Sequence, residues 1–244
     1  MKNFIEQYLK KHAFGTFSPK AVLFDMDGVI YNSMPNHAKS WHEAMASFGL
    51  QMAPDEVYEY EGMRGVETIK LLARRQWHRE LPDEEANRMY AEKSRRFNLC
   101  PPPQKMVGIT TLMQQIKADG LKIGIVTGSG QHSLLDQLEE AFPGLLHKEL
   151  MVTSFDVEHG KPSPEPYQAG MRKAGTEPWQ TVVVENAPLG VRAAVAAGCF
   201  TVAVNTGPLP DAALTAEGAD VVLPSIQALS DRWASLLKDW QQAL

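Results

Sequence analysis

The chain has little cysteine and no long apolar run, and each absence removes a class of protein. Its two thiols, Cys100 and Cys199, are too few for a disulfide framework and lack the spacing of a metal-binding motif. No stretch approaches the roughly 18 apolar residues of a membrane-spanning helix. The N-terminus carries Lys2, Glu6 and Lys10 where a secretory signal would be apolar. We therefore expect a cytoplasmic protein that does not enter membranes.

The chain also lacks an excess of positive charge. Its formal net charge is -5 at pH 7, so it has no general attraction for nucleic acid or for an anionic membrane surface. We expect no nucleic-acid partner, and an anionic substrate would need local help from a metal or from a few placed lysines. The 244 residues are enough for one core domain and a smaller second domain. The oligomeric state is not defined by the sequence, and a monomer is the simplest expectation.

Short apolar runs alternate with helical patterns along most of the chain. Such alternation predicts βαβ units and a parallel sheet that is covered on both faces. The runs predict strands at residues 21–24, 122–126, 149–152, 181–184, 201–204 and 221–223. Helical patterns lie between them at residues 109–118, 134–142, 164–174 and 189–197. A further short helix is expected within residues 1–19, as a packing element or a frayed end.

Residues 34–103 break this alternation, because they contain helical patterns and no apolar strand run. The expected helices span residues 36–48, 54–60, 66–77 and 83–97, and three prolines at 101–103 stiffen the return to the core. The sequence therefore predicts an α/β fold: a doubly wound parallel, Rossmann-like sheet with an inserted all-helical cap. Residues 1–33 and 104–244 would form the core domain, and residues 34–103 the cap domain.

Residues with useful chemistry follow four of the predicted strands. In an open α/β sheet, ligands bind beyond the carboxyl ends of the strands. Any one of these residues could be a turn or capping residue, but a joint occurrence at successive strand ends is unlikely to arise by chance. Acids, a hydroxyl, a lysine and an amide at one sheet edge indicate a site for phosphate and metal. The set is Asp25, Asp27, Thr127, Lys161, Glu185 and Asn186.

Four motifs that contain these residues resemble those of the haloacid dehalogenase superfamily. They are DMDGVI at residues 25–30, VTGS at 126–129, KPSP at 161–164 and VENAPLG at 184–190. Their order and spacing fit the family over residues 20–225. The helical insert looks like the small C1-type cap of this family. Within it the chain is similar to β-phosphoglucomutase and its relatives, and looks closest to the bacterial branch that acts as inorganic pyrophosphatase.

The resemblance implies that Asp25 is a nucleophile that becomes a phosphoaspartate. A carboxylate is already ionised at neutral pH and can attack phosphorus without losing a proton first. Asp27 would protonate the leaving oxygen and later accept a proton from the attacking water. Enzymes of this superfamily that cleave carbon–halogen bonds lack the second aspartate, so its presence indicates phosphoryl chemistry.

The second and third motifs would hold the transferring phosphoryl group. Thr127 would donate its hydroxyl, and the backbone amides of Gly128 and Ser129 lie near an expected helix N-terminus, where anions are favoured. Lys161 would neutralise charge and pair with Asp25. A solvated surface lysine is the alternative for Lys161, but the prolines around it favour a rigid, positioned loop.

The resemblance also implies a Mg²⁺ cofactor, which prefers hard oxygen ligands. Asp25, the backbone carbonyl of Asp27, and either Glu185 or Asn186 would supply the protein ligands. The family often has two acids at the fourth motif, whereas this chain has Glu185 followed by an amide. Which of these two side chains binds the metal is left open by the sequence.

Three cap residues are candidates for substrate binding. His37 lies in the first hinge region, where a histidine in mutase-like relatives links cap closure to the site; a surface helix position is the alternative. Glu61 occupies the place where a mutase has a lysine, and it could reach the metal in the closed form. Tyr90 could narrow the cavity from another cap helix, or could be a cap-core aromatic.

The resulting hypothesis is a Mg²⁺-dependent phosphohydrolase with a phosphoaspartate intermediate. A small phosphorylated compound is the expected partner, with inorganic pyrophosphate as the first choice because of Glu61. The alternative is a β-phosphoglucomutase or a sugar-phosphate phosphatase. A non-catalytic ligand-binding domain is a third possibility, which the intact pair Asp25 and Asp27 disfavours.

Overall fold

The computed structural model describes residues 2–128 and 132–241. Within these ranges six parallel strands form one sheet in the order β3-β2-β1-β4-β5-β6. Because β1 lies inside the sheet and the chain adds strands outward on both sides of it, the predicted doubly wound sheet is confirmed. The strands are β1 (Ala21–Phe24), β2 (Lys122–Val126), β3 (Met151–Val152), β4 (Thr181–Glu185), β5 (Phe200–Val204) and β6 (Val221–Leu223).

The apolar strands serve two cores, one on each face of the sheet. Successive strand residues point to opposite faces, so Val22 and Phe24 pack into one cluster and Leu23 into another. Both faces of β1 are therefore fully buried, which explains why its sequence is a continuous apolar run and does not alternate with polar residues.

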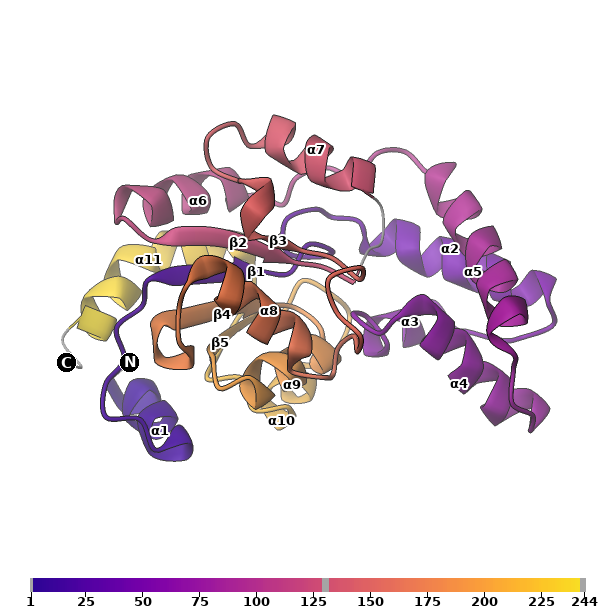
Figure 1. Cartoon of the computed structure of the whole chain (residues 1–244), viewed down its shortest axis with the longest axis horizontal. Helices are drawn as coiled ribbons and strands as arrows, with labels where there is room; N and C mark the ends of the chain where they lie inside the picture. Colours follow the sequence, from indigo (N-terminus) through magenta and orange to yellow (C-terminus); the bar gives the residue numbers. More distant parts are fainter. Residues whose placement is uncertain (1, 129–131, 242–244) are drawn as a thin grey trace.

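Helices cover both faces of the sheet (Figure 1). On one side lie α6 (Ile109–Ala118), α7 (His132–Ala141) and α11 (Ile226–Gln241), and on the other α8 (Glu165–Ala174), α9 (Pro188–Ala196) and α10 (Asp211–Ala216). The first helix, α1 (Lys2–His12), packs near α11 and buries Ile5 and Tyr8. No helix in the described ranges is long and apolar enough to cross a bilayer.

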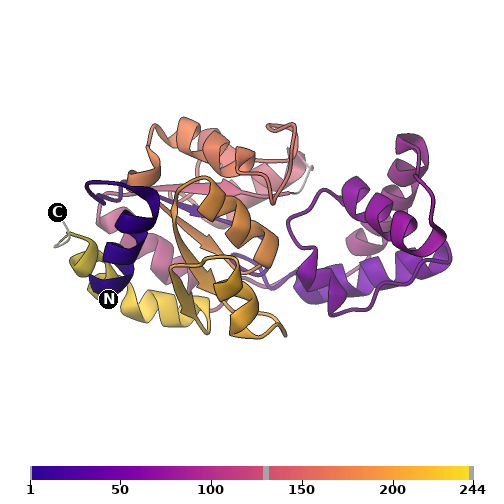
Figure 2. The same cartoon turned by 90° about the horizontal axis from the view of Figure 1, so that it is seen from below.

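Four helices stand apart from the sheet at one end of the molecule, as Figures 1 and 2 show. They are α2 (Met34–Ser47), α3 (Glu56–Glu59), α4 (Gly65–Trp77) and α5 (Asp83–Asn98). Their apolar faces form a separate cluster that includes Trp41, Leu72 and Met89. This packing agrees with the predicted division at residues 34–103, whose boundaries stay a prediction.

Some element boundaries differ from the sequence prediction. The strand expected at 149–152 is reduced to Met151–Val152, because residues 148–150 form a short 3₁₀ turn in which Leu150 N donates to His147 O at 2.9 Å. Within the described ranges, β2 is the one strand that pairs with this edge strand. The helix expected from residue 54 begins at Glu56. Neither α10 nor α11 was among the predicted helices, although α11 buries Trp233 and Trp240 in the main core.

Asp220 provides a test of the fold through pH. Burial raises its pKa to about 6, although the Thr201 amide and Lys11 favour the ionised form. A raised carboxyl pKa means that stability from this group is present below the unfolded pKa and lost as pH rises through about 6. We therefore expect the free energy of unfolding of Asp220→Asn to rise relative to that of the wild type, by about 1–3 kcal/mol in total, as the pH goes from about 4 to about 7.5.

Denaturant unfolding of both proteins at a series of pH values measures this difference. A stability difference that stays constant across the range would contradict the assigned role of Asp220.

Candidate active site

The register of the sheet brings Asp25, Thr127 and Glu185 together, because they lie at the carboxyl ends of β1, β2 and β4. Phe24 of β1 lies opposite Ile125 of β2 and Val184 of β4, so the residues that follow these strands meet at one edge. Asp25 continues the pairing, because its amide donates to Val184 O at 3.0 Å. Thr127 lies buried at the end of β2, where its amide donates to Val152 O at 3.0 Å.

Lys161 lies at the centre of this group and is almost completely buried. Its ammonium donates to Asp25 Oδ1 at 2.5 Å, to Glu185 Oε1 at 2.6 Å and to Val126 O at 3.2 Å. Burial alone would lower the pKa of Lys161, but the carboxylates of Asp25 and Glu185 raise it above its ordinary value. The lysine is therefore a permanent cation, and the alternative of a surface lysine is wrong.

The nucleophile candidate sits among several acids. Burial raises the pKa of Asp25 to about 7, with Lys161 opposing the shift and Glu185 and Asp27 adding to it. One of its oxygens, Oδ1, is occupied by Lys161, whereas Oδ2 has no hydrogen-bond partner among the described residues. Additional positive charge near Oδ2 would restore full ionisation at neutral pH.

Glu185 is enclosed by protein donors on both oxygens. Its Oε1 accepts from Lys161 and from the hydroxyl of Tyr167 at 2.7 Å, and its Oε2 accepts from the backbone amides of Asn186 at 2.9 Å and Ala187 at 3.1 Å. The side chain is fully buried. Each oxygen of Glu185 thus accepts two hydrogen bonds from the protein. Glu185 is therefore an ion-pair partner of Lys161, and its lone pairs are already taken by these donors.

Three buried oxygens, one of them on Asp25, point to a cation site. Asp25 Oδ2, Glu61 Oε1 and Asn186 Oδ1 have no hydrogen-bond partner in the part of the chain that the structure describes. Asn186 Nδ2 donates to Glu61 Oε2 at 3.1 Å, which brings the cap loop against the fourth motif. Buried oxygens without donors are costly, and three such oxygens are the kind of ligand that Mg²⁺ takes. The donor set therefore fits the implied metal.

Glu61 reaches this site from the cap. Burial raises its pKa well above the ordinary value, and Asp25, Glu185 and Asp27 raise it further. Gly28, at φ 81°, makes room for Asn186: a Cβ there would lie 2.2 Å from Asn186 Nδ2. A metal ion at this point would remove the repulsion among these acids.

The second aspartate is linked to the cap. Asp27 Oδ1 accepts from Ser33 Oγ at 2.6 Å and lies 3.2 Å from His37 Nε2, while His37 Nδ1 lies 2.8 Å from Lys93 Nζ. Burial alone would raise the pKa of Asp27, but His37 and Ser33 lower it. Burial and Lys93 lower the pKa of His37. The Lys93 ammonium donates to Nδ1, so the neutral ring carries its proton on Nε2, facing Asp27.

His37, a sequence candidate, lies 3.2 Å from Asp27, whereas Lys93 was not among the sequence candidates. This lysine occupies a buried position of α5 in line with Ala86 and Met89. Its ammonium lies over the rings of Trp41, at 5.3 Å, and Phe97, at 4.9 Å. A charged residue at an apolar helix position was the available signal.

A cavity of about 580 Å³ leads from the cap to Asp25 and Asp27. Tyr90 and Gly128 line it, as expected of substrate-binding residues, while Ser129 lies outside the described residues. Tyr90 fills the space beside Gly65, where a Cβ would lie 2.1 Å from its ring. Much of the remaining wall is apolar: Met34, Trp41, Met52, Val57, Met63 and Phe97.

The cap loop rests directly on the core. At Gly62, which has φ 85°, a Cβ would lie 2.8 Å from Lys161 Cδ. Arg64 Nη1 donates to Glu158 O at 2.8 Å in the loop that precedes Lys161. In this arrangement the cap covers the edge of the sheet at the carboxyl ends of β1, β2 and β4, which we call the catalytic edge.

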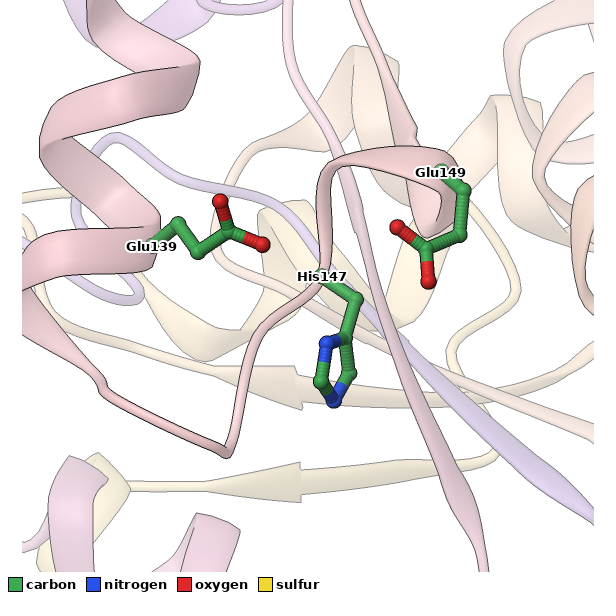
Figure 3. A group of neighbouring side chains, drawn as sticks. All are labelled: Glu139, His147 and Glu149. Carbon is green, nitrogen blue, oxygen red and sulfur yellow. The ribbon is translucent and has the colours of Figure 1, made fainter.

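A second group of possible metal ligands, Glu139, His147 and Glu149, lies away from this edge (Figure 3). Glu139 comes from α7, and the other two residues come from the segment that leads into β3. His147 and Glu149 are exposed, and Lys148 Nζ lies 3.7 Å from Glu139 Oε2. Because a protein cation already lies beside it, we assign this group no role.

Comparison with known proteins agrees with this geometry. A family model described as haloacid dehalogenase-like hydrolase matches residues 22–204. A solved structure of a putative β-phosphoglucomutase from Bacteroides vulgatus is 45% identical, with a TM-score of 0.93 over 100% of this chain and 97% of that one. The similarity therefore includes the cap as well as the sheet.

Two curated relatives are phosphatases of Escherichia coli (strain K12). Hexitol phosphatase A is 28% identical over 212 residues, which cover 86% of this chain and 93% of the relative. Fructose-1-phosphate phosphatase is 28% identical over 186 residues, which cover 75% of this chain and 95% of the relative. From the matched family model, the fold and these relatives, the chain belongs to the haloacid dehalogenase-like hydrolases and is a phosphohydrolase of that family.

Proposed function

We propose that the protein is a Mg²⁺-dependent phosphatase that removes the phosphoryl group from a small phosphorylated carbohydrate by way of a phosphoaspartate at Asp25. The observation that carries this proposal is the cavity of about 580 Å³ above Asp25, with its largely apolar wall. Inorganic pyrophosphate has no carbon skeleton to contact that wall. An organic leaving group would use it, as a pocket of this size and composition ordinarily does.

The relatives support the same substrate class. Both curated relatives described above are named for phosphates of small carbohydrates, and neither name mentions pyrophosphate. From the sequence we expected pyrophosphate first, with a β-phosphoglucomutase or sugar-phosphate phosphatase as the alternative, and these names favour a sugar-phosphate substrate. The predicted cytoplasmic location and monomeric state stay predictions.

In the proposed reaction, each of the site residues has a separate role. Lys161 donates to Asp25 Oδ1 and so orients the carboxylate that attacks phosphorus. Asp27 protonates the leaving oxygen and then accepts a proton from the attacking water, with His37 and Ser33 fixing its orientation. Asp25, the Asp27 backbone carbonyl and Asn186 would hold Mg²⁺, because Glu185 is committed to Lys161. When bound, the ion supplies positive charge to the phosphoryl oxygens.

Pyrophosphate remains the second candidate substrate because of Glu61. Its carboxylate lies against Asn186, which donates to Oε2, and its buried Oε1 has no hydrogen-bond partner among the described residues. A carboxylate there would repel a bare polyanion but could serve as a fourth metal ligand in the closed form. A metal-bound inorganic anion would suit that arrangement.

A substrate panel tests the proposed function. With Mg²⁺ present, we expect release of phosphate from hexitol phosphates, fructose 1-phosphate and hexose 6-phosphates at higher kcat/KM than from pyrophosphate. Chelation should abolish this activity, and Ca²⁺ should inhibit it, because the larger ion accepts higher coordination and misplaces Asp25. Faster turnover of pyrophosphate than of every ester would reject the carbohydrate assignment, and full activity after chelation would reject the metal.

Asp25→Asn should abolish turnover, with a loss of at least about 10³-fold, because the amide is not a nucleophile. Since burial raises the pKa of Asp25, its ionised form is unfavourable in the metal-free fold. The variant should therefore keep or exceed the wild-type Tm when no metal is added. Phosphate release and thermal unfolding measure the two effects, and normal turnover by the folded variant would refute the nucleophile.

Glu61→Ala separates the two substrate candidates, and Glu59→Ala, at an exposed position of the same cap segment, is the control. If Glu61 acts through the metal on pyrophosphate, its loss should lower pyrophosphate turnover by about tenfold or more and raise the ratio of ester to pyrophosphate turnover. The control should change neither quantity. An unchanged substrate profile and Mg²⁺ dependence in Glu61→Ala would remove the second candidate.

A further inference from the structure

We propose that Tyr167 is a positioning residue for phosphoryl transfer: its hydroxyl fixes Glu185, so that Lys161 stays centred between Glu185 and Asp25. The inference rests on the proposed role of Asp25 and does not depend on which phosphorylated compound is the substrate. It concerns a residue of α8 that the motif analysis did not single out.

Tyr167 makes two contacts with this group. Its hydroxyl donates to Glu185 Oε1 at 2.7 Å, the same oxygen that accepts from Lys161 at 2.6 Å. Its ring lies 5.1 Å from the Lys161 ammonium, within the range of a cation–π contact. Tyr167 is fully buried, so no solvent competes for these contacts.

The hydroxyl completes a set of donors around the Glu185 carboxylate. The backbone amides of Asn186 and Ala187 donate to Oε2, and among the described residues Oε1 accepts from Tyr167 and Lys161. Without the hydroxyl, Oε1 would keep only the Lys161 ammonium among its partners in the described part of the chain, and the two charged groups would shift together. A shift of the ammonium away from Asp25 Oδ1 changes the direction of the attacking oxygen, to which reaction rates are sensitive.

The protonation state of Tyr167 agrees with this role. Burial raises its pKa well above the ordinary value, and the charges of Glu185 and Asp25 raise it further. The phenol therefore remains a donor throughout the working range of pH.

A purely structural role is the competing explanation, because Tyr167 also belongs to an apolar cluster with Met171 and Ala194. Tyr8 offers a matched control. It is equally buried and its hydroxyl donates to Gly198 O at 2.8 Å, but it lies in α1, which packs near α11 and not at the catalytic edge. Tyr167→Phe and Tyr8→Phe each remove one buried hydroxyl and keep the ring.

The experiment compares both variants with the wild type in Mg²⁺, with para-nitrophenyl phosphate as the probe substrate. We expect Tyr167→Phe to lower kcat about tenfold, as loss of a hydrogen bond to a charged group would, with KM within about twofold. Tyr8→Phe should leave both constants unchanged. Unchanged kcat in folded Tyr167→Phe, or equal losses of kcat in the two variants, would overturn the proposal.

A double-mutant cycle tests the route through Glu185. In a Glu185→Gln background, replacement of Tyr167 by Phe should cost much less than in the wild type, because the charged acceptor is gone. Fully additive losses would contradict the proposal.

Beryllofluoride with Mg²⁺, a stable mimic of a phosphoryl group on aspartate, gives a readout without turnover. Tyr167→Phe should bind it several-fold more weakly than the wild type and Tyr8→Phe, as seen in the rise of Tm with ligand concentration. Equal binding by all three proteins would overturn the role of Tyr167. Failure of the wild type to hydrolyse the probe substrate would instead count against the proposed function.

Discussion

The buried ammonium of Lys161 is the interaction on which the rest of the site depends. It bonds both Asp25 and Glu185 at the carboxyl ends of β1 and β4, in a region almost without solvent. Loss of the ammonium would leave two buried carboxylates without their cation, and breaking a buried pair in this way typically costs about 3–5 kcal/mol. The parallel register of the sheet makes the arrangement possible, since it brings residues 136 positions apart in sequence within a hydrogen bond.

The charge balance around Lys161 also supports the proposed metal. Burial raises the pKa values of Asp25 and Glu61, and the carboxylates around each of them raise these values further. Tyr167 and two backbone amides stabilise Glu185, and His37 stabilises Asp27. The oxygens that remain without partners among the described residues lie on Asp25, Glu61 and Asn186, so the unsatisfied negative charge is concentrated where the proposed Mg²⁺ would lie.

Much of this architecture could be predicted because it depends on local sequence. Continuous apolar runs identified the strands, and the four motifs placed Asp25, Lys161 and Glu185 at one sheet edge. The choice between Glu185 and Asn186 could not be made, because it depends on which donors surround each side chain after folding. Lys93 and Tyr167 were missed for a related reason: each occupies a helix position whose spacing indicates only burial. The short β3 reflects an edge strand with one neighbour, which periodicity does not reveal.

The central claim is that Asp25 carries the phosphoryl group during turnover. Acid quenching of the wild type during its first turnover of para-nitrophenyl phosphate, followed by borohydride reduction and peptide mass spectrometry, tests it most directly. The account predicts that residue 25 alone is converted to homoserine, since borohydride reduces an aspartyl phosphate, and that Asp25→Asn yields none. Reduction at a different residue would contradict it. So would steady turnover in which samples quenched within the first turnover contain no trapped acyl phosphate.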